Sequence, residues 1–188
     1  MNFNIDKKAI ININTIGIIL DFIGGEPLMN LPAIDYTCSY FMDTCLALNH
    51  TWTNKWRASM ISNGAKYFET ATQDFLNKFY GLVSFSITLD GPKEIHDKCR
   101  KYHNGKGNFD DAYAAFKDCQ KRFGCDSTKV TIAPENLNEI NTIIDFFYNE
   151  GITQINANPI FEHSWTIPEA QRYYQELKQM ANKILTKY

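Results

Sequence analysis

Long hydrophobic runs and strong charge of one sign are both absent from this sequence. None of its 188 residues belongs to an apolar run near the roughly 20 residues that a membrane-spanning helix needs. The formal net charge is −2, and no basic stretch indicates a nucleic-acid or membrane partner. Asn12, Asn14 and Asp21 interrupt the apolar stretch near the N-terminus, which therefore does not resemble a signal peptide. These features predict a cytoplasmic globular protein.

Cysteine is scarce and scattered. The five cysteines are odd in number, and their spacing matches neither a zinc site nor a disulfide framework. We therefore expect reduced thiols. Cys38, Cys45 and Cys119 lie on apolar helical stripes, where a small buried side chain is the usual role. No metal ligand is predicted among the cysteines, which are Cys38, Cys45, Cys99, Cys119 and Cys125.

Short strand-like segments alternate with longer helix-like segments. The alternation predicts an α/β protein with a parallel sheet, and the pattern alone leaves a doubly wound sheet and a barrel open. In either fold, ligands bind at the carboxyl ends of the strands. The predicted strands are Gly17–Ile23, Ala58–Ile61, Leu82–Gly91, Lys129–Ala133 and Ile152–Asn158. The predicted helices cover about residues 34–48, 70–79, 109–123 (with Asn108 as its expected cap) and 137–147, and a last one from 166 onwards.

The third predicted strand has the clearest pattern. Apolar side chains at positions 83, 85, 87 and 89 alternate with Ser84, Ser86, Thr88 and Asp90. A period of two residues gives the strand one apolar and one polar face. In a barrel covered by helices, the polar set would face the lumen, although a strand that faces water gives the same pattern.

Several motifs in order resemble those of the radical S-adenosylmethionine (AdoMet) family. The likeness is to its peptide- and protein-modifying branch, which includes anaerobic sulfatase-maturating enzymes and SPASM-type peptide maturases. The motifs that carry the resemblance are Gly24-Gly25-Glu26-Pro27, Ser62-Asn63-Gly64, Thr88-Leu89-Asp90-Gly91-Pro92, His96-Asp97 with Arg100, and Gly105-Lys106-Gly107-Asn108-Phe109-Asp110. By itself, the first of these is also a plausible strand-to-helix turn.

The resemblance implies a partial (β/α)6 barrel of about five parallel strands with outer helices. It implies that the turn of Gly24, Gly25, Glu26 and Pro27 holds the amino group of AdoMet. Thr88 would contact the ribose, with Asn63 at the rim. Asp90 and Arg100 belong to the same expected cofactor-binding set, in which Arg100 pairs with a carboxylate of AdoMet or substrate. The alternative for His96, Asp97 and Arg100 is a local hydrogen-bonded loop.

The defining Cys-x-x-x-Cys-x-x-Cys motif of that family is absent. Its three thiolates hold a [4Fe–4S] cluster, and the 23 residues before Gly24 contain no cysteine. Residues 1–188 are therefore expected to be a fragment of one radical SAM core domain that lacks the first strand, the cluster loop and the C-terminal auxiliary domain. We expect this chain alone to bind no cluster and to be inactive.

The implied function is that of a core fragment of an enzyme that reductively cleaves AdoMet to modify a peptide or protein. Two alternatives remain: a non-catalytic AdoMet- or partner-binding module built on the same barrel, and an ordinary α/β barrel enzyme. A missing first strand would also expose the edge along Gly17–Ile23 and favour self-association.

Overall fold

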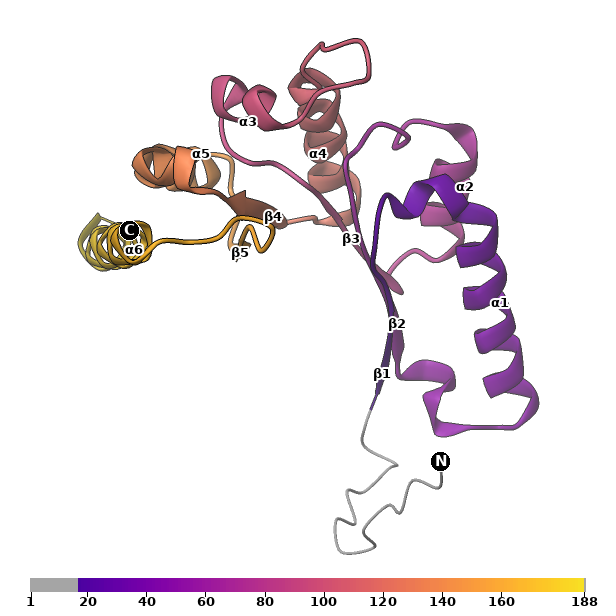
Figure 1. Ribbon diagram of the computed structural model, residues 1–188. Coiled ribbons are helices and arrows are strands. Elements are labelled where there is room, and N and C mark those ends of the chain that lie inside the picture. The colour runs from indigo at the N-terminus through magenta and orange to yellow at the C-terminus, as the bar shows by residue number, and fades with distance from the viewer. Residues whose placement is uncertain (1–16, 188) are drawn as a thin grey trace, which may run out of the picture.

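The computed structural model describes residues 17–187 (Figure 1). Strands and helices alternate along this part of the chain, as the periodicity predicts. The strands are β1 (Ile18–Phe22), β2 (Trp56–Ser62), β3 (Val83–Ile87), β4 (Ser127–Ile132) and β5 (Gln154–Pro159). The helices are α1 (Leu31–Ala47), α2 (Thr70–Lys78), α3 (Lys93–Cys99), α4 (Phe109–Phe123), α5 (Ile140–Asn149) and α6 (Ile167–Lys187).

The five strands form two parallel sheets. The first has the order β1-β2-β3, and the second contains β4 and β5. In the first sheet, Asp21 of β1 lies opposite Ser59 of β2, which lies opposite Ser84 of β3. In the second, Lys129 lies opposite Asn156. No described strand pairs antiparallel with β1, so the parallel arrangement that the sequence predicts is confirmed within each sheet.

The described strands pair as two sheets, so the expected continuous sheet of a partial barrel is not shown. Side chains make hydrogen bonds at the junction between β3 and β4. The hydroxyl of Thr128 donates to the carbonyl of Ile87 at 2.9 Å and accepts from the backbone N–H of Leu89 at 2.9 Å. The hydroxyls of Ser86 and Ser127 bond to each other across the same junction. The backbone groups of β3 that a neighbouring strand would use are thus partly satisfied by side chains.

The helices lie on the outer side of the strands. In Figure 1, α1 and α2 lie beside the first sheet, α4 covers β3, and α5 and α6 lie beside β4 and β5. Phe85 and Ile87 are buried on this outer side, whereas Ser84 is exposed. The burial of Phe85 and Ile87 agrees with the predicted apolar face of β3, while Ser86 of the polar set is also buried, at the junction with β4. The largest fully buried side chains of the core include Trp56, Met60, Tyr67, Phe79, Phe116 and Phe147.

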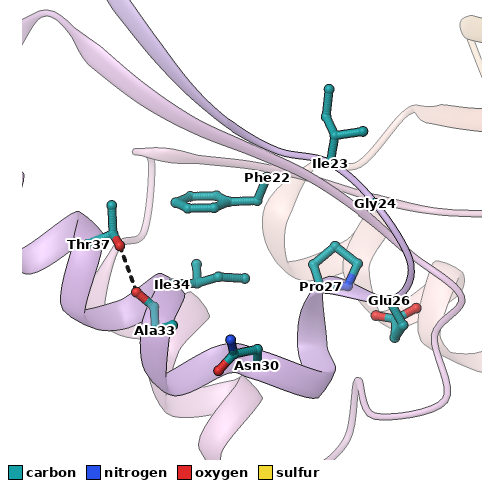
Figure 2. Close-up of a pocket in the computed structure, with 9 residues that line it drawn as sticks. All are labelled: Phe22, Ile23, Gly24, Glu26, Pro27, Asn30, Ala33, Ile34 and Thr37. Atoms are coloured by element: carbon teal, nitrogen blue, oxygen red, sulfur yellow. Dashed lines mark hydrogen bonds between the residues drawn. The ribbon is translucent and has the colours of Figure 1, made fainter.

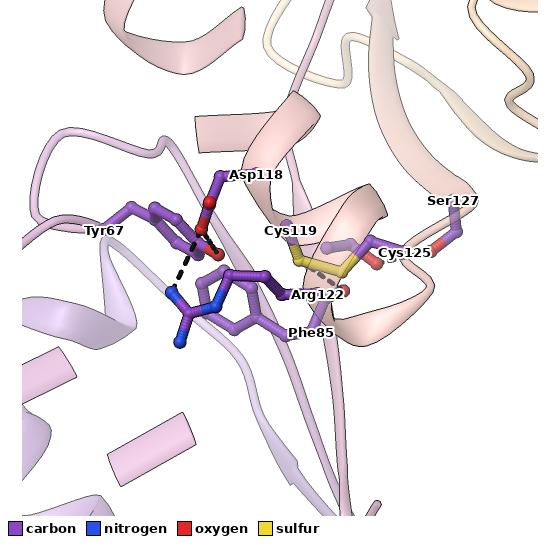
Figure 3. The surroundings of a disulfide bond; sticks show 8 residues. Tyr67, Phe85, Asp118, Cys119, Arg122, Cys125 and Ser127 are labelled. Atoms are coloured by element: carbon purple, nitrogen blue, oxygen red, sulfur yellow. Dashed lines mark hydrogen bonds and ion pairs between the residues drawn. A yellow bond between two sulfur atoms is a disulfide. The ribbon is translucent and has the colours of Figure 1, made fainter. Parts of the chain in front are cut away.

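The expectation that all thiols are reduced is wrong for two cysteines. A disulfide joins Cys119 near the end of α4 to Cys125 (Figure 3). Gly124 ends the helix with a φ of 68°, a left-handed conformation that glycine adopts readily. This turn brings the Cα atoms of the two cysteines to 5.6 Å, which is within the range of a disulfide. The spacing of the cysteines in the sequence could not predict this pairing, because it depends on the turn at Gly124 that brings the two residues together.

The two cysteines of α1 are buried, as their helical stripe predicts. Cys38 is fully buried, and burial raises the pKa of its thiol to about 11. Cys45 is also buried, while Cys99 is exposed at the end of α3.

None of the described helices is both long and apolar enough to span a bilayer.

Candidate functional site

A cavity of about 430 Å³ lies at the carboxyl ends of the strands, on the side away from the helices. Both sheets contribute to it, as does the loop that follows β3. Most of its side chains are polar, and they come from the strands and from the loops that follow them. The lining residues are Asp21, Phe22, Ile23, Gly24, Gly25, Ser59, Ile61, Thr88, Arg100, Lys129, Thr131 and Asn156.

Gly24 and Gly25 line this cavity with backbone alone. Their φ angles are 108° and 46°, and a Cβ atom built at either position would meet no other heavy atom within 4 Å. Glycine is therefore required by the backbone conformation rather than by crowding. The result is a stretch of open backbone after β1 that a ligand can approach closely.

Glu26 holds this loop against the end of β2. One carboxylate oxygen, Oε1, accepts from the hydroxyl of Ser62 at 2.8 Å, and Oε2 accepts from the backbone N–H of Asn63 at 2.7 Å. Oε1 also accepts from the N–H of Leu28 at 3.1 Å. The side chain is therefore engaged with the protein itself, and Glu26 acts first as a positioning residue for the glycine loop.

A second cavity of about 290 Å³ lies on the outer side of β1, against α1 (Figure 2). Phe22, Glu26, Pro27, Ile34 and Thr37 are among the residues that line it. Among the expected site residues, Glu26 and Pro27 line this outer cavity rather than the cavity between the sheets. Gly24 lines both.

Thr88 and Asn63 lie at the rim of the first sheet. Thr88 follows β3, lines the larger cavity and is almost completely buried; its backbone N–H donates to the carbonyl of Ser62 at 2.8 Å. The side-chain oxygen of Asn63 accepts from the N–H of Ala65 at 2.9 Å. Asn63 therefore shapes the turn after β2, while Thr88 is one of the residues that line the cavity.

Asp90 and Arg100 form an ion pair that joins the β3 loop to β4. Asp90 is 3% exposed, and its Oδ2 accepts from Nε of Arg100. Its Oδ1 accepts from the backbone N–H of Thr131 at 3.1 Å. Both oxygens of this buried carboxylate thus have partners. Arg100 lines the cavity, and Asp90 holds it there.

His96 helps to hold Asp90 in place for its ion pair with Arg100. Its Nδ1 accepts from the backbone N–H of Asp90 at 3.1 Å, so the ring proton lies on Nε2, which bonds Oδ1 of Asn108 at 2.9 Å. Burial of the ring lowers the pKa of His96 below its ordinary value. The side chain of Asn108 is therefore hydrogen-bonded to His96, and it does not form the cap of α4 that the sequence predicts.

Asp97 takes the capping role instead. Its Oδ1 accepts from the N–H of Phe109, the first residue of α4, at 2.9 Å. His96 and Asp97 thus form the local hydrogen-bonded loop that the sequence left open as an alternative. Arg100 belongs to this loop through its ion pair with Asp90, and it also lines the cavity, as expected for a residue of the cofactor-binding set.

Five polar residues that line the larger cavity belong to none of the sequence motifs, although the expectation that ligands bind at the carboxyl ends of the strands includes two of them, Thr131 and Asn156. Each of these side chains has at least one apolar neighbour along its strand, as Lys129 and Thr131 do on either side of Val130. The same period of two that identified Thr88 could have found them. They are Asp21, Ser59, Lys129, Thr131 and Asn156.

The described residues do not fit an iron–sulfur cluster. Within residues 17–187, no group of three histidine, cysteine or acidic side chains lies close enough together to hold a metal ion. Cys38 and Cys45 are buried, Cys119 is bonded to Cys125, and Cys99 lies alone on the surface. A cluster needs several thiolates held together.

Comparisons with known proteins support the fold. The sequence matches no known family model. The chain resembles the solved structure of a histidine-tagged form of anSMEcpe with bound AdoMet, with a TM-score of 0.68 and 19% identity. A structure of native anSMEcpe with bound AdoMet and Kp18Cys peptide gives the same values, and in both cases the match covers 90% of this chain and 48% of the other. The chain thus spans about half the length of these enzymes, which are anaerobic sulfatase-maturating enzymes of the radical SAM type.

A curated relative matches a smaller part of the sequence. An uncharacterized protein from Synechocystis sp. (strain ATCC 27184 / PCC 6803 / Kazusa), sll1766, is 30% identical over 76 residues, which is 40% of this chain and 19% of that protein. Together the comparisons establish an α/β fold with parallel sheets, similar to that of radical SAM enzymes.

Proposed function

We propose that this chain is the AdoMet-binding portion of a radical SAM core domain that acts on a peptide or protein. The observation that carries the proposal is the polar cavity at the carboxyl ends of both sheets, where Gly24, Gly25, Thr88 and Arg100 meet. The motifs that suggested AdoMet from the sequence supply one side of this cavity. The structural likeness to anSMEcpe with bound AdoMet supports the same site.

The residues present fit AdoMet by their chemistry. Carbonyl groups of the open backbone at Gly24 and Gly25 would accept from its ammonium group, and the hydroxyl of Thr88 would bond its ribose. Asn63 would close the rim. Asp90 and Glu26 would hold the two loops in place rather than bind the ligand. In radical SAM enzymes, bound AdoMet supplies a sulfonium group whose reductive cleavage drives removal of a hydrogen atom from the substrate.

We propose that this chain by itself binds AdoMet weakly and does not cleave it. Cleavage requires an electron that the family takes from its cluster, and the described cysteines are too dispersed to hold one. For binding through these contacts alone we expect a dissociation constant on the order of 1 mM, which corresponds to a binding free energy of about −4 kcal/mol.

A non-catalytic AdoMet-binding module is the second candidate. The engagement of Cys119 and Cys125 in a disulfide and the burial of Cys38 and Cys45 favour it. Both candidates predict no 5′-deoxyadenosine from this chain after anaerobic reconstitution with iron and sulfide and addition of a reductant. A longer chain with an upstream Cys-x-x-x-Cys-x-x-Cys motif separates them, because it should form this product under the first candidate and not under the second. Product from the 188-residue chain would contradict our account of its cysteines.

The site itself is tested by mapping AdoMet onto the protein. In a titration of the ¹⁵N-labelled chain followed by NMR, AdoMet should shift the backbone resonances of Gly24, Gly25 and Thr88. Residues of the outer cavity, such as Thr37, serve as an internal control. Shifts confined to the outer cavity, or no shifts at several times the expected dissociation constant, would contradict the proposed function.

A further inference from the structure

The second sheet supplies three of the twelve residues that line the cavity, and the AdoMet proposal uses none of the three. Lys129 and Thr131 come from β4, and Asn156 comes from β5. Lys129 and Asn156 lie side by side, since they are register partners in the sheet. The groups proposed for AdoMet all belong to the first sheet and its loops. The β4–β5 side is therefore available to a second ligand.

The charge of Lys129 is not balanced within the described part of the chain. Arg100, the other cation of the cavity, pairs with the buried carboxylate of Asp90, whereas Lys129 makes no ion pair with any residue in 17–187. Lys129 is partly buried. Among the lysines whose side chains are described, the following also make no ion pair with a described residue, but each of them is exposed: Lys101, Lys106, Lys121 and Lys178.

A partly buried ammonium group in a concave site attracts anions more strongly than one on a convex surface. The protein walls reduce screening by water and concentrate the field in the cavity. Asp21 is the opposing charge of the cavity, and it lies on β1 in the other sheet. An anionic group is therefore directed towards β4 and β5 and away from β1.

We infer that Lys129 binds a carboxylate of the peptide substrate, with the amide of Asn156 and the hydroxyl of Thr131 as neighbouring hydrogen-bonding groups. The inference rests on the proposed function for the peptide, and it adds the substrate class: peptides with an aspartate or glutamate next to the residue that is modified. Asparagine in place of the acid removes the charge but keeps the shape.

Two blocked peptides test the inference on the 188-residue chain. The probes are acetyl-Gly-Gly-Asp-Gly-Gly-amide and the same peptide with asparagine at the centre, each titrated into the ¹⁵N-labelled protein. The acidic peptide should shift resonances of Lys129, Thr131 and Asn156. Lys129→Gln should weaken its binding about tenfold, as expected for the loss of a charged hydrogen bond. The affinity for the asparagine peptide should not change.

Matched variants separate charge from damage to the fold. Lys129→Arg should retain the preference for the acidic peptide, and Lys121→Gln, at an exposed lysine without an ion pair to any described residue, should leave it unchanged. Equal binding of the two peptides, no binding of either, or an equal loss of both in Lys129→Gln would overturn the inference.

An AdoMet titration distinguishes this inference from the proposed function. Lys129→Gln should leave AdoMet binding within about twofold of the wild type, since its contacts lie on the first sheet. A tenfold loss would mean that Lys129 holds the carboxylate of AdoMet, and would overturn the peptide assignment. Failure of the wild type to bind AdoMet would count against the proposed function, while the peptide preference would still be measured without AdoMet.

Discussion

The junction between β2 and β3 differs in kind from the junction between β3 and β4. The first is a parallel ladder in which five residue pairs are in register, from Ala58 opposite Val83 to Ser62 opposite Ile87. The second depends on a few side chains, above all Thr128, Ser86 and Asp90. Backbone ladders tolerate most substitutions, because every residue offers the same groups. The β3–β4 junction should instead be sensitive to single side chains, and the cavity spans it.

Thr128→Val should have the largest effect on this junction. Valine has nearly the same shape but leaves the buried carbonyl of Ile87 and the N–H of Leu89 without their partner. We expect a loss of about 3 kcal/mol in the free energy of unfolding, measured by urea denaturation. Ser59→Ala, on a ladder-paired strand, should cost no more than about 0.5 kcal/mol. Similar losses in the free energy of unfolding for the two variants would contradict the proposed difference between the two junctions.

Reduction of the disulfide should have the next largest effect. The bond between Cys119 and Cys125 fixes the turn that leads from α4 into β4. Closing a loop of this length contributes about 2 kcal/mol in the chain-entropy account. We therefore expect the free energy of unfolding, measured by urea denaturation, to fall by about 2 kcal/mol when a reductant is added. The double variant Cys119→Ala, Cys125→Ala should not respond to reductant, and a wild type that is equally insensitive would show that the bond does not form in solution.

The pH dependence of stability should report on His96. Its pKa is lowered by burial, so between the ordinary value near 6.5 and the lower folded value the unfolded chain binds more protons. Stability should therefore be complete above that range and fall as the pH drops through it, by at most about 1.4 kcal/mol per pH unit. His96→Gln should abolish this dependence, and His103→Gln, at an exposed histidine, should retain it. An unchanged profile in His96→Gln would contradict the neutral, buried ring.

The free edge of the first sheet should affect association more than stability. Among the described strands β1 pairs only with β2, and Ile19 is 66% exposed on it. We propose that the chain self-associates through this edge, and that Ile19→Lys weakens association in sedimentation velocity by adding charge to the edge. Leu185→Lys, at an exposed position of α6, is the control. A wild type that remains monomeric at high concentration would refute the proposal.

The same contrast explains which parts of the fold were predictable. The strands and helices follow from local periodicity, and the burial of Phe85 and Ile87 follows from the period of two in β3. The β3–β4 junction depends on contacts between residues 41 positions apart, such as Thr128 with Ile87. No local pattern identifies which hydroxyl replaces a ladder bond.

The site shows a similar division. The motifs placed Gly24, Gly25, Thr88 and Arg100 together, and the structure brings them to one cavity. The partners of Glu26, the hydroxyl of Ser62 and the N–H of Asn63, could not be predicted, because they lie 36 and 37 residues away on another strand. The role of Glu26 in the loop is therefore a finding of the structure.

Calorimetric titration of AdoMet into two threonine variants tests the central claim, that the cavity between the two sheets is the AdoMet site. Thr88→Ala removes the hydroxyl of a residue that lines that cavity, and Thr37→Ala makes the same change at a residue that lines the outer cavity beside α1. Thr88→Ala should weaken AdoMet binding about fivefold, the effect of one neutral hydrogen bond, and Thr37→Ala should leave it unchanged. A loss in Thr37→Ala alone, or equal affinities for both variants and the wild type, would contradict the claim.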